Sequence, residues 1–330
     1  MSRTLNLDDW LRAQLPGEPY SLAPASEDAS FRRYLRVTTM GGTRIVMDAP
    51  PEHEDCRPFV KVARLFAQAG VNVPRILGED LENGYLLLTD LGSTMYLDVL
   101  DEASAPRLYA AASDALVRIQ LASRPGTLPE YDRALLLREL RLFPDWYIGK
   151  QLGIALPGPQ SDTLAAVFEL ILANNLAQPR VYVHRDYHSR NLMVTEPNPG
   201  IIDFQDAVYG PVTYDLVSLF KDAYVRWDEE HVIDWVVRYW EKAGEAGLPV
   251  HADFGTFYRD FEWMGVQRHL KVLGIFARLF HRDGKARYLQ DMPLVMSCLR
   301  AACERYAALS PLLRLLDDLD KKQVFVGYTG

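Results

Sequence analysis

Cysteine, long apolar runs and clusters of basic residues are all scarce in this sequence, and each shortage excludes a class of protein. Three cysteines occur in 330 residues, Cys56, Cys298 and Cys303, without metal-binding spacing, so we expect reduced thiols. No uncharged apolar run approaches the ~20 residues of a membrane span, and residues 1–15 lack the apolar segment of a secretory signal. The net charge is −8, with lysine and arginine scattered, which argues against a nucleic-acid partner. We therefore expect a cytoplasmic protein.

The length and the hydrophobic pattern predict an α+β protein of two lobes that share a cleft. The composition, 48% hydrophobic and 24% charged, is that of a globular chain. The first lobe, residues 1–91, is predicted to be small and rich in strands. Its expected elements are a helix at 6–15 with Asn6 as N-cap, strands at 33–38 and 44–47 around a Gly41-Gly42 turn, a helix at 56–69 and a strand at 84–89.

The second lobe, residues 92–330, is predicted to be larger and mainly helical. Apolar residues recur there at the three- and four-residue spacing of amphipathic helices. Pro144 is expected to bend the chain after one of these helices, and Ser161 is expected to cap another. The expected helical regions are residues 107–122, 133–143, a segment from 161, 231–243, 253–280 and 288–319.

A polar loop interrupts this helical lobe between short apolar strands at residues 181–183, 192–194 and 200–202. His184-Arg185-Asp186 followed by Asn191 fits the pattern His-Arg-Asp-x-x-x-x-Asn of kinase catalytic loops, and Asp203 stands where such enzymes carry a second metal-binding aspartate. An isolated His-x-Asp is usually a capped turn. The joint match of the spacing, the flanking strands and the second aspartate favours phosphoryl transfer.

Phosphoryl transfer requires positioning, a proton acceptor and cations held against the phosphates. Asp186 is predicted to orient the attacking hydroxyl and to accept its proton. Asn191 and Asp203 supply the oxygen ligands that Mg²⁺ prefers. His184 is expected to hold the loop by hydrogen bonds rather than to act in the chemistry.

The loop with its second histidine, His188, resembles the aminoglycoside phosphotransferase and choline kinase family. Ile202-Asp203-Phe204, Gly210-Pro211 and Tyr214-Asp215-Leu216 extend the resemblance. It implies the bilobal protein-kinase-like fold, with Asp186 as base, Asn191 and Asp203 as metal ligands and Asp215 as a structural residue. The stretches that resemble a narrower branch, the bacterial cell-wall amino-sugar kinases, are residues 47–51, 89–92 and 267–274. That branch phosphorylates the anomeric hydroxyl of N-acetylmuramate and N-acetylglucosamine in peptidoglycan recycling.

Two features depart from the protein-kinase pattern in the first lobe. Residues 27–34 contain no glycine, so backbone N–H groups there are predicted to bind phosphate with help from Ser30, Arg32 or Arg33. The alternative for both arginines is an exposed strand edge. The strand at 44–48 also lacks the lysine that pairs with phosphates. Either Arg32, Arg33 or Lys61 replaces it, or the nucleotide is held in a different way, or the protein is an inactive pseudokinase that binds nucleotide without catalysis.

The remaining candidates concern the two substrates. The end of the strand at 84–89, with Thr89, Asp90 and Leu91, is predicted to form the hinge that binds the adenine of ATP, although it is also an ordinary buried strand. The sugar is predicted to meet Gln205 and Asp206, which follow the metal-binding aspartate. Less direct candidates on the helices are Trp146, Tyr147, Trp263, Gln267 and His269.

Arg268 and Lys271 lie near those helical candidates. Either would pair with the lactyl carboxylate of N-acetylmuramate, but a solvated helix face is the expected environment for both.

The sequence thus predicts an ATP- and Mg²⁺-dependent kinase that phosphorylates a sugar hydroxyl, most specifically the anomeric hydroxyl of an amino sugar, and that acts as a monomer. An anomeric hydroxyl is more acidic than a primary alcohol, so positioning and metal charge would dominate. Two alternatives remain. An aminoglycoside or choline acceptor would require a strongly acidic pocket, for which no dense acidic cluster is evident. A nucleotide-binding pseudokinase would explain the missing lysine.

Overall fold

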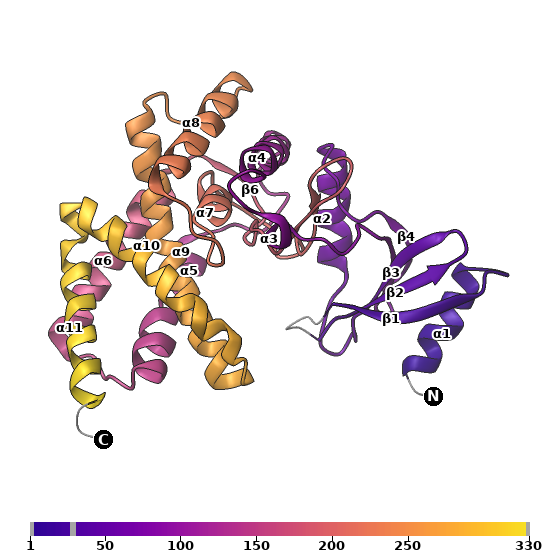
Figure 1. The fold of residues 1–330 in the computed structure, drawn as a ribbon, viewed down its shortest axis with the longest axis horizontal. Helices are drawn as coiled ribbons and strands as arrows, with labels where there is room; N and C mark the ends of the chain where they lie inside the picture. The colour runs from indigo at the N-terminus through magenta and orange to yellow at the C-terminus, as the bar shows by residue number, and fades with distance from the viewer. Residues whose placement is uncertain (1–2, 27–30, 328–330) are drawn as a thin grey trace. The chain divides into compact units, whose positions relative to one another are not determined.

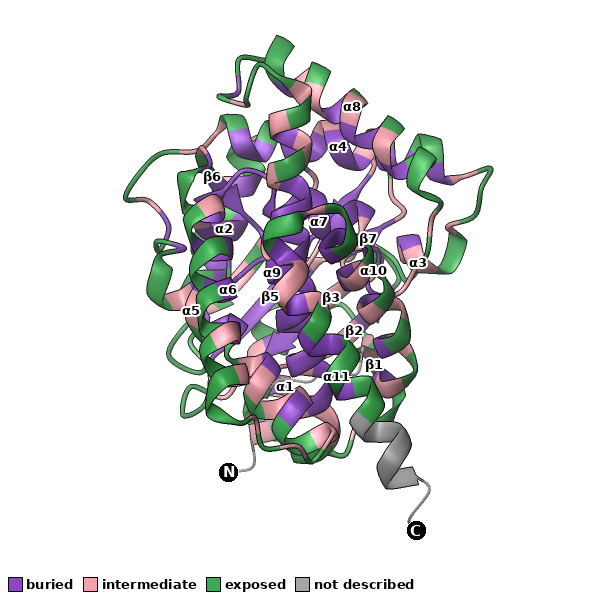
Figure 2. Ribbon diagram, turned by 90° about the vertical axis from the view of Figure 1, so that its left-hand side faces the viewer, coloured by how far each residue is buried: buried purple, intermediate pink, exposed green. Residues whose placement is uncertain are grey.

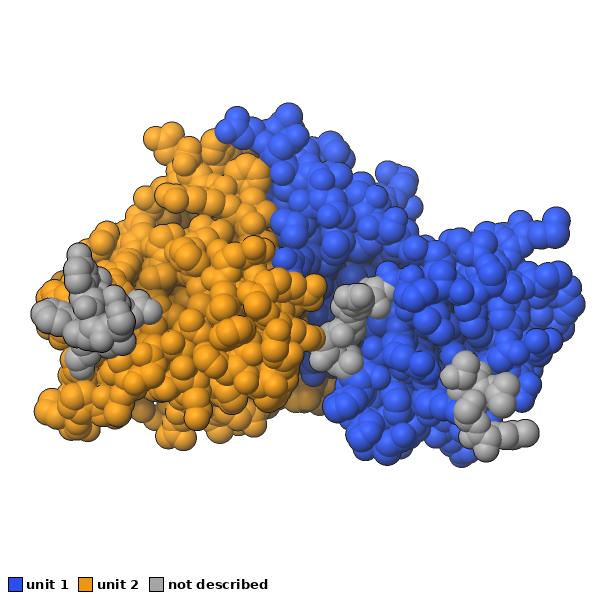
Figure 3. All heavy atoms as spheres, turned by 60° about the horizontal axis from the view of Figure 1, so that its bottom comes forward, with its two compact units in different colours: residues 1–119, 189–207 blue, residues 120–188, 208–330 orange. Residues whose placement is uncertain are grey.

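A computed structural model describes residues 3–26 and 31–327. The chain folds into two compact units, which Figure 3 colours blue and orange. The first consists of Met1–Ile119 and Ser189–Ala207, and the second of Gln120–His188 and Val208–Gly330. The polar loop at 184–191 therefore contributes residues to both units. The predicted lobe boundary at residue 91 differs from these divisions and stays a prediction.

The first unit is built on a five-stranded antiparallel sheet with the order β1-β2-β3-β5-β4. Figure 1 shows its strands in indigo and purple. The three central strands were predicted, whereas both edge strands were missed. β1 contains Pro24, and β4 contains Gly78 and two acidic residues, so neither shows a strong strand pattern; edge strands tolerate such residues. The bounds are β1 Tyr20–Ser26, β2 Arg33–Thr39, β3 Gly42–Asp48, β4 Ile76–Asp80 and β5 Tyr85–Thr89.

Helix α1 (Arg3–Gln14) covers one face of this sheet. Leu7 and Leu11, one turn apart, are buried in a cluster with Val37, Val46 and Leu87. The predicted helix is confirmed, but Asn6 is not its N-cap because the helix begins at Arg3. The remaining elements of this unit are α2 (Arg57–Gln68), α3 (Tyr96–Val99), most of α4 (Ala105–Leu121), β7 (Leu192–Met193) and β8 (Gly200–Ile201).

The second unit is mainly helical and is organised around α9 (Phe254–Asp283). This helix packs against η1, η2, α5, α6, α7, α8 and α10, and Figure 2 shows α7 and much of α9 as buried. The other bounds are α5 Arg133–Leu140, η1 Phe143–Gln151, α6 Gly158–Ala177, β6 Arg180–Val183, β9 Val208–Pro211, α7 Tyr214–Phe220, α8 Glu229–Glu245, η2 Ala286–Asp291, α10 Met292–Arg305, η3 Ala307–Leu309 and α11 Ser310–Gly327.

Local signals explain where α9 begins and ends. Asp253 accepts a hydrogen bond from the N–H of Thr256 (2.8 Å) at its N-terminus, and Gly284 ends it in the left-handed conformation (φ 70°). In its middle, a Cβ on Gly274 would lie 2.4 Å from the carbonyl carbon of Leu142. Glycine therefore lets the segment before η1 approach the helix closely.

Two helix boundaries differ from the predictions. Ser161 is not a cap, because α6 already begins at Gly158 after Pro157. The predicted helical region 288–319 is divided into η2, α10, η3 and α11, with a proline in the first turn of α10.

The fold class is confirmed: a β-rich N-terminal part precedes a mainly helical C-terminal part. All three cysteines are free, as expected. Among the described residues, none of the helices combines the length and apolarity needed to span a bilayer.

Candidate active site

The strands around the polar loop belong to two separate ladders. β6 leads into the loop and pairs antiparallel with β9, both in the second unit. β7 leaves the loop and pairs with β8, both in the first unit. The sequence predicted strands at the positions of β6, β7 and β8 but missed β9, and the pairing of all four depends on contacts beyond the local pattern.

The buried carboxylate of Asp215 holds the start of the loop. Asp215 lies in the first turn of α7 and accepts hydrogen bonds from the backbone N–H groups of His184 (2.6 Å) and Arg185 (3.0 Å). The N–H of Asp186 in turn donates to Nδ1 of His184 (3.2 Å). Arg185 has a left-handed backbone (φ 77°), which a non-glycine residue adopts at a cost. These hydrogen bonds fix the backbone that presents Asp186.

Burial raises the pKa of Asp215 to about 6, although His184 and the two backbone N–H donors act in the opposite direction.

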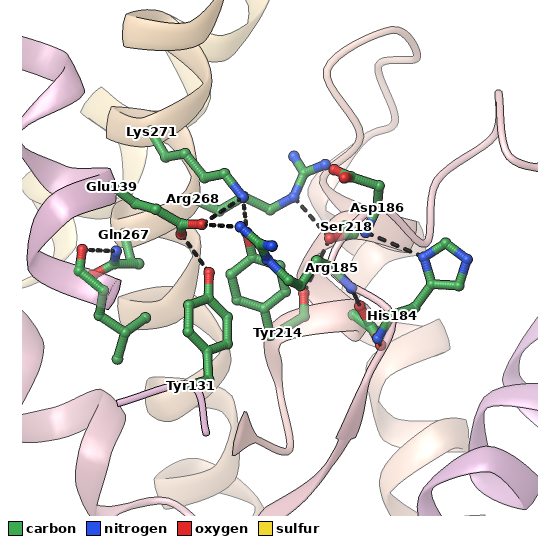
Figure 4. A network of polar contacts seen from close by, with 12 residues as sticks. Tyr131, Glu139, His184, Arg185, Asp186, Tyr214, Ser218, Gln267, Arg268 and Lys271 are labelled. Atoms are coloured by element: carbon green, nitrogen blue, oxygen red, sulfur yellow. Dashed lines mark hydrogen bonds and ion pairs between the residues drawn. The ribbon is translucent and has the colours of Figure 1, made fainter. Parts of the chain in front are cut away.

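A buried ionic network lies next to this turn (Figure 4). Glu139 of α5 pairs with Arg185 (2.6 Å) and with Lys271 of α9 (3.2 Å), and it also accepts a hydrogen bond from Tyr131. Lys271 donates to the hydroxyl of Tyr214 (2.8 Å). One carboxylate thus serves two cations. Sequence reasoning missed Glu139; the available signal was a single acidic residue within the leucine-rich α5.

Asp186 is surrounded by positive charge from its own unit. Burial by itself would raise the pKa of this carboxyl, but Lys271, His188, Arg268 and Arg185 outweigh that effect and lower the pKa to about 2. The carboxylate is consequently ionised at neutral pH. It is a hydrogen-bond acceptor that can orient a hydroxyl and receive its proton.

The prediction that Arg268 and Lys271 lie on a solvated face of α9 is wrong. Arg268 is 3% exposed and Lys271 6% exposed, because neighbouring helices pack against α9 on several sides. Arg268 Nε donates to Ser218 Oγ (2.7 Å). His269 is also buried, and burial together with Lys221 and Arg268 lowers its pKa to about 3. A polar sequence here does not indicate an exposed surface.

The other predicted sugar contacts on helices have different environments. Gln267 is buried and its Nε2 donates to the carbonyl of Leu136 (3.0 Å), so its amide nitrogen links two helices. Trp263 is buried, and its ring packs edge-on against Tyr306. Trp146 is half-buried in η1.

The metal-binding candidates lie together in the first unit. The carboxylate of Asp203 accepts hydrogen bonds from Nδ2 of Asn191 (3.3 Å) and Nε2 of Gln205 (2.8 Å). Asp203 is exposed and has a left-handed backbone (φ 62°). Phe204, next in the chain, is buried against Phe59 of α2 (ring centroids 4.8 Å apart) and anchors this turn.

This donor set fits a magnesium ion that keeps water and phosphate ligands. Mg²⁺ sites commonly use only one or two carboxylates, the other ligands being waters and substrate phosphates. The described residues contain no cluster of three or more histidine, cysteine, aspartate or glutamate side chains suited to a metal. Turning the side-chain amide of Asn191 over would present its oxygen to a metal.

The two arginines predicted to bind phosphate in the first unit are engaged in ion pairs. Arg32 pairs with Glu54 (3.0 Å). Burial would lower the pKa of Arg32, but Tyr34, Glu54 and Asp206 raise it. Arg33 pairs with the fully buried Asp48. Ser30 lies outside the described residues, and Lys61 is an exposed residue of α2.

The predicted hinge is held by Arg36, which sequence reasoning missed. Its guanidinium donates two hydrogen bonds to Asp90 (2.7 and 3.2 Å) and a third to the carbonyl of Gly92 (3.0 Å). The hydroxyl of Thr89 accepts from the N–H of Arg75 (2.9 Å). The side chains of Thr89 and Asp90 therefore shape the segment, and Leu91 is half-buried.

Two close relatives cover nearly the whole chain. A kinase from Pseudomonas aeruginosa is 53% identical over 96% of this chain and 97% of its own length. A kinase from Neisseria meningitidis serogroup B is 48% identical over the full length of both chains. Both are named N-acetylmuramate/N-acetylglucosamine kinase.

Solved structures show the same fold at low sequence identity. A choline/ethanolamine kinase family protein from Mesorhizobium loti has a TM-score of 0.62 at 16% identity, covering 95% of this chain and 99% of its own. The GDP complex of aminoglycoside 2′-phosphotransferase-IIIa has a TM-score of 0.62 at 15% identity, covering 92% and 100%. The model of the Phosphotransferase enzyme family matches residues 21–254. With this match and the two full-length relatives, the chain belongs to the Phosphotransferase enzyme family.

Proposed function

We propose that this enzyme transfers the γ-phosphoryl group of ATP to the anomeric hydroxyl of N-acetylmuramate and N-acetylglucosamine, a step of peptidoglycan recycling. The observation that carries the proposal is the ionised, rigidly presented carboxylate of Asp186 in a chain 53% identical to a kinase named for these sugars. We further propose a cytoplasmic monomer, whose mass size-exclusion chromatography with light scattering would measure.

Asp186 acts on the acceptor hydroxyl. A carboxylate with so low a pKa is a weak base, yet an anomeric hydroxyl is more acidic than other sugar hydroxyls. Orienting the hydroxyl then contributes more to the rate than removing its proton early. The proton passes to an Asp186 oxygen as the acceptor oxygen bonds to the γ-phosphorus, while the bond from that phosphorus to the β–γ bridging oxygen breaks and ADP leaves. His184 and Asp215 act indirectly by fixing the loop backbone, and we assign His188 to the support of the same loop.

The nucleotide side uses residues of the first unit. Asn191 and Asp203 would hold Mg²⁺, which neutralises charge on the transferring phosphoryl group. Thr89, Asp90 and Leu91 would present backbone groups to adenine. Their geometry depends on Arg36.

Phosphate binding in this unit is assigned to Ser30, Arg32 and Arg33. Arg32 and Arg33 already have carboxylate partners, so phosphate would have to share or displace those contacts.

The residues predicted to contact the sugar differ in their burial and in whether a polar atom lacks a hydrogen-bond partner. Gln205 is buried, and its Oε1 has no hydrogen-bond partner among the described residues, so we assign it a sugar hydroxyl. Asp206 is exposed and Trp146 half-buried, and both are proposed to line the sugar site. His269 is almost fully buried, and neither of its ring nitrogens has a hydrogen-bond partner among the described residues; we assign it to the lining of the same site.

ATP consumption with a panel of acceptors tests the proposal. We expect turnover with N-acetylmuramate and N-acetylglucosamine and none with kanamycin or choline. Asp186→Ala and Asp203→Ala should each lower kcat by at least roughly 10²-fold, as the loss of a base or metal ligand does. The exposed Asp162 on α6 provides the control, and Asp162→Ala should retain full activity.

Other results would contradict the proposal in distinct ways. Tight ATP binding without turnover on any acceptor would indicate a nucleotide-binding regulator. Turnover with kanamycin or choline alone would change the acceptor class. Near-wild-type rates in the Asp186 or Asp203 variant would refute the mechanism.

A further inference from the structure

Arg268 is a buried cation that its protein neighbours satisfy only in part. It lies in the middle of α9 and is 3% exposed. Its Nε donates to the neutral hydroxyl of Ser218 (2.7 Å). Its Nη1 is buried and has no hydrogen-bond partner among the described residues. A buried hydrogen-bond donor without an acceptor costs free energy. An acceptor atom on a bound ligand would satisfy this guanidinium.

Arg268 attracts the carboxylate of Asp186 strongly enough to lower its pKa, but it forms no ion pair with Asp186 or Glu139. Glu139 is engaged by Arg185 (2.6 Å) and Lys271 (3.2 Å). Within the described part of the chain, no carboxylate lies at ion-pair distance from Arg268. A buried charge is usually paired. The missing partner of Arg268 is therefore expected to be an anion.

Arg268 lies on the acceptor side of the reaction. Figure 4 shows its side chain reaching from α9 toward the turn that carries Asp186, and its charge contributes to the low pKa of that carboxyl. An acceptor whose hydroxyl meets Asp186 brings its other substituents to this neighbourhood. Lys271, the other cation on this stretch of α9, already bonds Glu139 and Tyr214. Only Arg268 of these two has a buried donor left over.

We propose that Arg268 binds the lactyl carboxylate of N-acetylmuramate and so gives the enzyme a preference for the acidic amino sugar over N-acetylglucosamine. The inference rests on the proposed function. Guanidinium and carboxylate form charge-assisted, often bidentate hydrogen bonds, and N-acetylglucosamine lacks the carboxylate. The other anion that could pair with Arg268 is the transferring phosphoryl group, which is present in the reaction with either sugar. A selective effect on one sugar therefore distinguishes the two.

The test compares Arg268→Gln and Arg268→Lys with wild type on both sugars, measured as kcat and KM by ADP release. We expect Arg268→Gln to lower kcat/KM for N-acetylmuramate roughly 10- to 100-fold through KM, the usual range for a hydrogen bond to a charged group. For N-acetylglucosamine kcat/KM should change less than about threefold by the same reasoning. Arg268→Lys keeps the charge but loses the planar fork, so its loss should be intermediate. Arg282→Gln, at the exposed end of the same helix and paired with Asp283, is the matched control.

A neutral analogue makes the test independent of how well a variant folds. On the lactyl amide of N-acetylmuramate, the kcat/KM of the wild-type enzyme should be lower than on the acid by the same factor as for Arg268→Gln on the acid. The kcat/KM of Arg268→Gln should be equal for the amide and the acid. Equal losses on both sugars would overturn the inference and assign Arg268 to the phosphoryl group or to Asp186. An unchanged acid-to-amide ratio in Arg268→Gln would overturn it as well. Wild-type enzyme inactive on both sugars would instead refute the proposed function.

Discussion

Glu139→Gln tests the ionic network that supports the catalytic turn. Glu139 is 4% exposed and is the shared counterion of Arg185 and Lys271. Its pKa is lowered: burial opposes ionisation, but Lys271, Arg185 and a hydrogen bond from Tyr131 outweigh it. The folded protein therefore contains the carboxylate at neutral pH. Glutamine keeps the shape of the side chain and removes the charge that two buried cations need.

The magnitude follows from two opposing contributions. At an effective dielectric constant of about 20, the attractions across contacts of 2.6 and 3.2 Å are worth roughly 6 and 5 kcal/mol, respectively. Removing the charge also removes the several kcal/mol that desolvating Glu139 costs. Breaking a buried pair on one side typically destabilises by about 3–5 kcal/mol, and we expect Glu139→Gln to lower the free energy of unfolding by about this amount.

Urea unfolding followed by circular dichroism measures this loss through the transition midpoint and slope. Glu169→Gln removes a carboxylate from an exposed pair with Arg133, with side chains 58% and 52% exposed, and should cost less than about 1 kcal/mol. A double-mutant cycle compares the loss of unfolding free energy that Lys271→Met causes in the wild type and in Glu139→Gln. The loss should be smaller in Glu139→Gln by at least about 1 kcal/mol, because there the substitution removes a cation that has lost its counterion. If Glu139→Gln and Glu169→Gln had the same small effect, the reasoning would be refuted.

Two further variants test the α9 environment. Lys271→Met removes the largest attraction that holds the pKa of Asp186 near 2. That pKa should rise, so as the pH is lowered kcat/KM should begin to fall at a higher pH than in wild type. Superimposable profiles over the acid range, from about pH 2 to 6, would contradict this. Gly274→Ala should destabilise by about 2 kcal/mol or more, because the new Cβ would lie 2.4 Å from the backbone of Leu142. In Gly244→Ala the Cβ would meet only a side-chain atom at 3.9 Å, so thermal unfolding should show a neutral or stabilising change there.

Local patterns were sufficient for the elements that carry strong periodicity. The central strands β2, β3 and β5 were predicted because turns and apolar alternation mark them, and α9 because its apolar spacing persists over many residues. The edge strands escaped because proline, glycine and charged residues weaken the pattern where a strand has only one neighbour. Burial on α9 also escaped, since periodicity assigns polar residues to solvent and takes no account of how many helices surround one helix.

The sequence by itself was sufficient for the fold class, through its hydrophobic periodicity along the whole chain, and for the family, through several short motifs. It also named the candidate base and metal ligands, because these lie in one polar loop and the turn after it, where spacing along the chain sets which residues recur. Tertiary structure decided what surrounds them. Residues from α5, α7 and α9, far apart in the chain, bring Glu139, Asp215, Arg268 and Lys271 around the turn before Asp186. Electrostatic interactions depend on distance in space and on burial. The low pKa of Asp186 and the partly unsatisfied Arg268 are therefore properties of the packed helices.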